Sequence, residues 1–333
     1  MFLFDLAGET GGFDPLILLL LALCLEGLVG NFVFPARPGA AVLIPFARLM
    51  DGADHKLNRE SRSHAVRTLR GALVVLFFLV LALALGLGVA WASQNLPFAW
   101  ILELALLITL IAQRGLVHGL RGAGLALDTD GARIALERLG GEGLEQADIH
   151  GLARQAVEIS AGGFSERVMA PVFYYALFGL PGLLIYRVLS MLAIKIGRPG
   201  KKYRGFGFTA ARMAGVLDLI PARLAGIIIV LAAMFVPSAR PGQAWKAMGA
   251  NSCGGDDSSG VYLGGQGWPL GAMGGALDLS LTGRHGPRDT SSWMGGGRAK
   301  AVPRDVSRAL YVFGVACLLN AAWVGALTVF RYA

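Results

Sequence analysis

Residues 186–224 read YRVLSMLAIKIGRPGKKYRGFGFTAARMAGVLDLIPARL, a basic stretch between strongly apolar ones. It contains eight lysine and arginine residues. Its centre at 197–207 cannot form a regular helix, because Pro199 lacks a backbone donor and the glycines allow positive φ. A compact cationic loop at a bilayer surface can bind a phosphate or a carboxylate. It can equally be a positively charged cytoplasmic loop that only orients the protein in the membrane.

The apolar stretches of the chain are long enough to cross a membrane. Hydrophobic residues make up 55% of the chain and its mean hydropathy is +0.58, which is high for a soluble domain. Residues 71–102 hold no charged residue over 32 positions, and residues 309–330 hold none over 22. Either run can span a hydrocarbon core of about 30 Å. The sequence therefore predicts an all-α polytopic integral membrane protein.

We expect a single membrane domain over residues 1–333 with about four to six transmembrane or re-entrant segments and basic cytoplasmic loops. The expected membrane segments are about 16–34, 71–92, 97–112, 168–190, 220–239 and 309–330, and the expected soluble loops are 37–70, 113–167, 195–215 and 240–308.

Two of these segments raise questions of topology. Residues 168–190 are interrupted by Gly179-Leu-Pro-Gly182 and have basic loops on both sides, so we expect a broken, re-entrant hairpin. Whether 220–239 crosses the membrane stays open. Glu26 interrupts the first segment. A buried acid in a membrane is often functional, but Glu26 is near one end and could reach the interface.

Charge and cysteine content exclude several classes of protein. The formal net charge of +8 suits an anionic lipid surface or acidic substrates. Nucleic acid is not expected as a partner, because the basic residues lie in separate loops between membrane segments. The cysteines Cys24, Cys253 and Cys317 are odd in number and far apart, which predicts neither a disulfide framework nor a zinc site. No Lys or Arg precedes Arg37, so the first apolar run is expected to be retained as a membrane segment.

Several exact strings of this chain resemble the CobD/CbiB family of cobalamin-biosynthesis membrane proteins. The strings are Val157-Glu158, MAPVFY at 169–174, Tyr186-Arg187, KYRGFG at 202–207, Ala211-Arg212-Met213, IPARL at 220–224 and GWPLGAMGGAL at 267–277. The order of the apolar segments extends the resemblance to nearly the whole chain.

The resemblance implies an amide-forming ligase. Such enzymes join an aminopropanol, or its phosphate, to the propionate carboxyl of adenosylcobyric acid and give adenosylcobinamide or its phosphate. Mg²⁺ and ATP are expected if that activity is retained. The resemblance further implies a multi-pass protein of the bacterial inner (cytoplasmic) membrane. Its expected partners are the lipid bilayer, a corrinoid or other anionic small molecule, a second copy of the chain, or other cobalamin-pathway proteins.

A site for this reaction needs cations for phosphates and carboxylates for Mg²⁺. The residues expected to bind the substrate or another anion are Lys202, Tyr203, Arg204, Arg212 and Arg223. The acids depart from the family pattern: an Asp-Asp pair is replaced by Ala214-Gly215, a further Asp by Ala193 and a Glu by Leu270. The acids that remain are Glu158, Glu166, Asp218, Asp256 and Asp257, of which the first three are the candidate catalytic residues. No metal ligands are assigned.

These replacements leave two hypotheses open. In the first, the chain is a divergent ligase, and at least two of the remaining acids converge within about 5 Å to form a Mg²⁺ site. In the second, the chain is a catalytically degenerate relative that acts as a corrinoid-binding scaffold or as a membrane signalling protein of the AmpE type, which residues 216–226 also resemble. Whether the chain is an enzyme is therefore not decided by its sequence.

Overall fold

The computed structural model describes residues 13–33, 40–58, 63–125, 130–141, 144–145, 147–197, 203–250, 267–282 and 293–333. Its helices are α1 (Pro15–Val33), α2 (Ala40–Leu57), α3 (His64–Asn95), α4 (Trp100–Leu110), α5 (Arg114–Leu125), α6 (Asp130–Arg138), α7 (Ile149–Phe164), the π-helix η1 (Ser165–Met169), α8 (Ala170–Ile196), α9 (Phe208–Met234), α10 (Pro241–Ala250), α11 (Gly267–Leu277) and α12 (Pro303–Tyr332). The described residues form no strand beyond isolated bridges.

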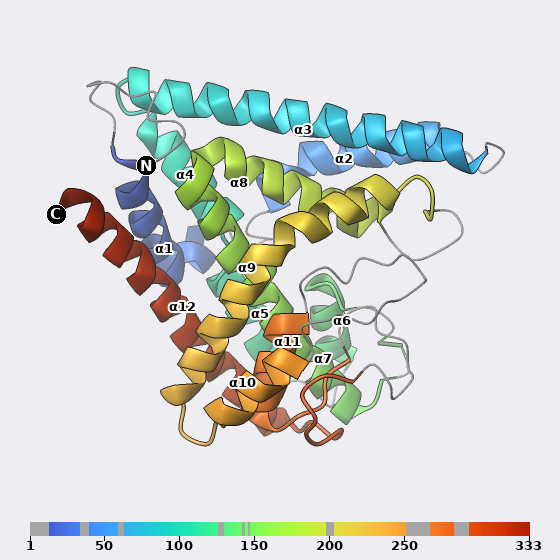
Figure 1. Cartoon of the computed structure of the whole chain (residues 1–333), viewed down its shortest axis with the longest axis vertical. Coiled ribbons are helices and arrows are strands. Elements are labelled where there is room, and N and C mark those ends of the chain that lie inside the picture. Colours follow the sequence, from blue (N-terminus) through green and yellow to red (C-terminus); the bar gives the residue numbers. More distant parts are fainter. Residues whose placement is uncertain are drawn as a thin grey trace.

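The architecture confirms the expected all-α membrane class. Five helical stretches of the described chain are long and apolar enough to cross a membrane: 64–95, 100–124, 149–196, 208–234 and 303–332. In Figure 1, α3 lies along one edge of the molecule, and α6, α7, α10 and α11 gather at the opposite end. Helices α8, α9 and α12 occupy the space between them. The chain is therefore a multi-pass membrane protein whose helices associate with the lipid bilayer.

The long helix α3 packs tightly on the middle of α8. A Cβ atom added to Gly86 of α3 would lie 2.5 Å from Cα of Pro181, so only glycine admits this approach. Helix α3 stops at Asn95, and Leu96 and Pro97 separate it from α4. This is where the expected break at 93–97 lies, because Pro97 and the extended Leu96 before it do not continue a helix.

Helix α8 contains a sharp break at Gly179. This residue has φ 66° and ψ −158°, a combination that is essentially restricted to glycine, and Pro181 follows it. The interruption expected from Gly179-Leu-Pro-Gly182 is thus present within α8. The surrounding helix is longer than the expected segment of 168–190, since it continues to Ile196.

The expected loop at 113–167 contains helices α5, α6 and α7. Helix α5 begins only a short turn after α4 ends, and the stretches 100–124 and 149–196 both qualify as membrane spans. The physical reason lies in Glu26, which is buried on α1. The backbone N–H of Arg114 donates to Oε1 of Glu26 at 2.9 Å, and the Arg114 guanidinium donates to the carbonyl of Gly27 at 3.3 Å. Arg114, at the start of α5, is thereby bonded to α1.

Replacing Glu26 with alanine is expected to destabilise the protein by about 1–2 kcal/mol, because α5 would lose the side-chain acceptor at its N-terminus. Thermal unfolding of the purified protein in detergent micelles measures this change. Glu26→Gln is the matched variant, since it keeps an acceptor oxygen and should lose much less. An alanine variant as stable as the parent chain would show that Glu26 does not cap α5.

The chain between α9 and α12 is partly helical, although residues 240–308 were expected to form a soluble loop. Helix α11 packs closely against α10, since a Cβ atom on Gly275 would lie 2.6 Å from the carbonyl oxygen of Gln243. Bridges join Leu279 to Arg298 and Leu281 to Met294. Asp305 on α12 accepts from the guanidinium of Arg298 and from the backbone of Val302. The segments 279–281 and 294–298 therefore pair with each other, and Arg298 joins them to the start of α12.

Candidate functional site

Two of the candidate acids, Glu166 and Asp218, lie near the buried Tyr186. The hydroxyl of Tyr186 on α8 donates to Oδ1 of Asp218 on α9 at 2.8 Å. Glu166, in the π-helix η1, is close enough to interact electrostatically with Asp218, with Tyr186 and with Arg187. Glu166, Tyr186 and Asp218 are all buried. We call Glu166, Tyr174, Tyr186, Arg187 and Asp218 the acid–tyrosine site.

The break at Gly179 brings the two tyrosines of this site together. The rings of Tyr174 and Tyr186 stack with centroids 5.2 Å apart and an interplanar angle of 16°. On a straight helix their twelve-residue separation would place their Cα atoms about 18 Å apart. The Tyr174 hydroxyl donates to the carbonyl of Leu217 at 2.8 Å, next to Asp218. Both tyrosines therefore hold α9 in register with α8.

The local structure of η1 places Glu166. Residues 165–169 form a π-helical turn between α7 and α8. Such turns insert an extra residue into a helix and occur often at functional sites. Ala112, in the bend between α4 and α5, donates its backbone N–H to the carbonyl of Arg167 at 3.2 Å. This hydrogen bond from the bend between α4 and α5 holds the π-helical turn in place.

Arg187 supplies the cation of the site. Its buried Nε has no hydrogen-bond partner in the part of the chain that the structure describes. The guanidinium lies in the fields of Glu166 and Tyr186. A buried guanidinium donor without an acceptor suits a carboxylate or phosphate ligand, because it gains charge-assisted hydrogen bonds when the anion arrives.

Tyr174 and Arg187 were not among the site residues predicted from the sequence. The available signal was the Tyr186-Arg187 pair, which stands inside an otherwise apolar stretch, where an ionisable residue points to function. Tyr174 gave no such signal, because an aromatic residue in an apolar helix is ordinary core. Its role depends on the break at Gly179.

The predicted anion-binding residues do not gather around the acids. Tyr203 uses its hydroxyl to donate to Oδ2 of Asp54 at 3.1 Å, and Arg204 is exposed. The exposed guanidinium of Arg212 lies 5.6 Å from the ring centroid of Phe208, and that of Arg223 lies 5.4 Å from the ring of Trp268. Lys202 lies outside the described residues, as do Asp256 and Asp257.

The cationic loop is tied to α2 on the described side. Lys195, at the end of α8, forms an ion pair with Asp51 and donates to the carbonyl of Ala47 at 3.1 Å. The bond from Tyr203 to Asp54 adds a second tie to the same helix. Asp54 also accepts from the side-chain amide of Asn58 at 2.8 Å. These contacts give the start and end of the loop a structural role on α2.

Glu158 is separated from the acid–tyrosine site by its partners. Its Oε1 accepts from the backbone N–H of Thr282 at 2.7 Å and from the Thr282 hydroxyl at 3.1 Å. This carboxylate joins α7 to the segment that follows α11. The arrangement gives Glu158 a positioning role.

The described residues fit Mg²⁺ only when a bound phosphate supplies part of its ligands. They include no group of three or more His, Cys, Asp and Glu side chains that could hold a metal ion. Magnesium, however, is commonly bound by one or two carboxylates together with substrate phosphates. Glu166 supplies that minimum, and the unpartnered Nε of Arg187 fits the accompanying anion.

Comparison with known proteins gives one consistent result. The family model described as "CobD/Cbib protein" matches residues 19–313. A protein named "Cobalamin biosynthesis protein CobD" from Sinorhizobium sp is 32% identical over 94% of this chain and 98% of its own length. Proteins of the same name from Rhizobium meliloti and Rhodobacter capsulatus are each 31% identical, over 91% and 80% of this chain and 94% and 82% of their own lengths. No solved structure gives a significant match.

Proposed function

This chain belongs to the CobD/Cbib protein family, and from this premise we propose that it acts in cobalamin biosynthesis as an amide-forming ligase. It would join an aminopropanol, or its phosphate, to the propionate carboxyl of adenosylcobyric acid. The observation that carries the proposal is the hydrogen bond from Tyr186 to Asp218, with Glu166 near enough to interact electrostatically and with an Arg187 Nε that has no partner among the described residues. It pairs acids with a cation, as this chemistry requires.

Each residue of the site receives a distinct task. Arg187 binds the carboxylate or phosphate group of a substrate through charge-assisted hydrogen bonds. Tyr186 holds Oδ1 of Asp218, which leaves Oδ2 outside that bond to accept the proton of the attacking amine. Glu166 would hold Mg²⁺, and bound Mg²⁺-ATP would supply the phosphoryl group that activates the carboxyl. The stacked Tyr174 shields the hydrogen bond between Tyr186 and Asp218.

A second candidate function follows from the small number of acids. The acid–tyrosine site contains two carboxylates, and no group of three metal-ligating side chains occurs in the described part of the chain. A scaffold that binds the corrinoid without catalysis would need only Arg187 and the tyrosines. A signalling role of the AmpE type is not favoured, because the relatives reported above are all named for cobalamin biosynthesis.

The proposed location is the inner membrane of a bacterium, which rests on the membrane-spanning helices and on the bacterial relatives. We propose a second copy of the chain or other cobalamin-pathway proteins as its protein partners.

The direct test is an amidation assay on the whole chain reconstituted in lipid bilayers. Adenosylcobyric acid, aminopropanol phosphate and Mg²⁺-ATP are supplied together, and the corrinoid product is identified by its mass. The ligase proposal predicts adenosylcobinamide phosphate and ADP in equal amounts, and free aminopropanol is tested in parallel. Corrinoid binding without product would move the chain to the scaffold function, and the absence of both would contradict the two candidates together.

A further inference from the structure

We propose that a cavity between α8, α9 and α12 binds one hydrocarbon chain of a membrane lipid. The cavity volume is about 690 Å³. Its walls come from all three helices and are lined by Met169, Phe173, Ala176, Leu177, Leu224, Ile228, Leu231, Leu319, Ala322, Trp323 and Leu327. These side chains are aliphatic, aromatic or thioether, so the wall offers predominantly apolar contacts.

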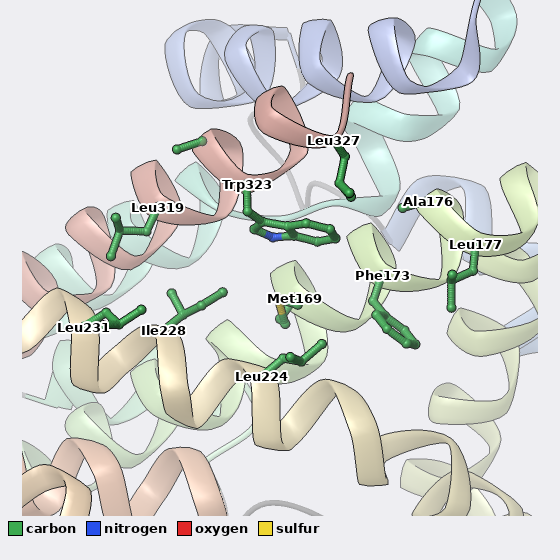
Figure 2. A pocket seen from close by; sticks show the side chains of 11 residues that line it. Met169, Phe173, Ala176, Leu177, Leu224, Ile228, Leu231, Leu319, Trp323 and Leu327 are labelled. Carbon is green, nitrogen blue, oxygen red and sulfur yellow. The ribbon is translucent and has the colours of Figure 1, made fainter. Parts of the chain in front are cut away.

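Trp323 presents its apolar ring to the cavity, while its polar N–H group is hydrogen-bonded to another residue. Its ring covers one side of the cavity, facing Met169 and Phe173 across the space (Figure 2). The indole N–H, the only hydrogen-bond donor of this side chain, donates to Oδ1 of Asn320 at 2.8 Å. The occupant therefore needs no acceptor. Water is a poor occupant as well, since it requires polar partners that an apolar wall lacks.

The surroundings of the cavity identify its occupant as lipid hydrocarbon. The three helices belong to stretches long and apolar enough to cross a membrane. The lining residues Leu231 and Leu327 are 44% and 39% exposed, so the cavity opens onto the outer surface of the bundle. The helices that line the cavity also carry exposed apolar side chains at Leu318, Met234 and Phe330. In a bilayer, acyl chains are the medium that faces such an opening.

The size of the cavity favours one held chain over the passing contact of bulk lipid. Ligand pockets of proteins have volumes of about 300–1,000 Å³, and this cavity lies within that range. An apolar cavity of about 150 Å³ already binds benzene, so the space here is large enough for a longer hydrocarbon. Lipid tails are as apolar as leucine, so what holds the chain is the fit of its contacts with the wall.

The cavity shares a wall with the acid–tyrosine site. Phe173 packs edge-on against Tyr174 with ring centroids 5.3 Å apart, and Met169 ends the π-helix that contains Glu166. A chain bound in the cavity would therefore press on Phe173 and support the stacked Tyr174 from behind. This inference about lipid does not depend on the proposed reaction.

Quenching of tryptophan emission tests the proposal on the purified full chain in detergent micelles. Phosphatidylcholine brominated in the middle of its acyl chains is added in rising molar ratio. The emission of Trp323 is obtained by subtracting the emission of the Trp323→Phe variant from that of the parent chain. The emission of Trp91 is obtained in the same way with Trp91→Phe. Trp91 lies on α3 and is 63% exposed. We expect the Trp323 signal to be quenched with saturation at about one lipid per chain, the stoichiometry of a single pocket. The Trp91 signal should fall gradually.

A matched pair of variants on α12 supplies the control. Ala322→Phe fills the cavity from the lipid side and should abolish the saturating phase. Leu318→Phe adds an aromatic ring to a position that is 72% exposed and outside the lining, and should retain it. Trp323 and Trp91 quenched along the same curve would overturn the proposal in favour of bulk lipid. No quenching of Trp323 would overturn it as well, because the cavity would then be closed or covered by a second copy of the chain.

Discussion

Replacement of Asp218 by asparagine is expected to reduce amide formation at least about a hundredfold, the usual effect of removing a group that transfers a proton. Asparagine keeps the shape of the side chain and an oxygen that can accept from the Tyr186 hydroxyl. The variant should therefore fold and insert as the parent chain does. It loses the ionisable carboxyl group and with it the oxygen that would take up the proton of the amine.

The rate of product formation by the reconstituted protein measures this effect, with ligand binding measured alongside. Asp130→Asn is the matched control, because the Asp130 side chain is 89% exposed and its ion pair among the described residues is with Arg133 at 3.4 Å. Tyr186→Phe should show a smaller loss, since it keeps the stack on Tyr174 and removes only the hydroxyl. Full activity of Asp218→Asn would remove Asp218 from the catalytic site.

Replacement of Gly179 by alanine is expected to lower the stability of the protein by about 1–3 kcal/mol, the cost of placing a Cβ atom in a backbone region that is nearly restricted to glycine. Relaxation of the strain toward an ordinary helix would straighten α8. Tyr174 and Tyr186 would then separate, and Tyr174 or Tyr186 would lose its bond to α9. We therefore expect the loss of activity to exceed the loss of folded protein.

Gly88→Ala is the control for this variant. Gly88 lies within α3, and a Cβ atom there would meet no other atom within 4 Å. Alanine at that position should be neutral or stabilise the helix by up to about 1 kcal/mol, because glycine is the poorer helix former. Thermal unfolding in micelles ranks the two variants. Equal stability of Gly179→Ala and Gly88→Ala would contradict the role assigned to the break in α8.

The class of the fold could be predicted from the sequence because it depends on long uncharged runs. Residues 71–102 and 309–330 indicate membrane helices whatever the tertiary structure. The first run covers most of α3, the break at 96–99 and the start of α4, and the second lies within α12. The break at Gly179 was also visible, since glycine and proline act locally. The helical course of 113–125 was not, because it depends on the buried Glu26, which lies 88 residues from Arg114 in the chain.

The acids of the candidate site could be predicted from the sequence, but its arrangement could not. Glu166 and Asp218 were selected as acids, but nothing in their spacing shows that they meet at Tyr186. That meeting requires the widened turn η1 and the reversal within α8, which bring three separate segments together. The anion-binding role of the cations in 195–215 stays a prediction. Charge pattern alone cannot show that Lys195 pairs with Asp51 or that Arg212 lies over Phe208.

The most direct test of this account is the affinity of the purified chain for adenosylcobyric acid, measured by titration calorimetry with two arginine variants. We predict that Arg187→Gln weakens binding by at least about tenfold, since a hydrogen bond to a charged group contributes about 1.5–3 kcal/mol. Arg212→Gln, at an exposed arginine of α9, should bind as the parent chain does. Loss of binding in Arg212→Gln with full binding in Arg187→Gln would contradict the account and place the ligand on the outer basic surface.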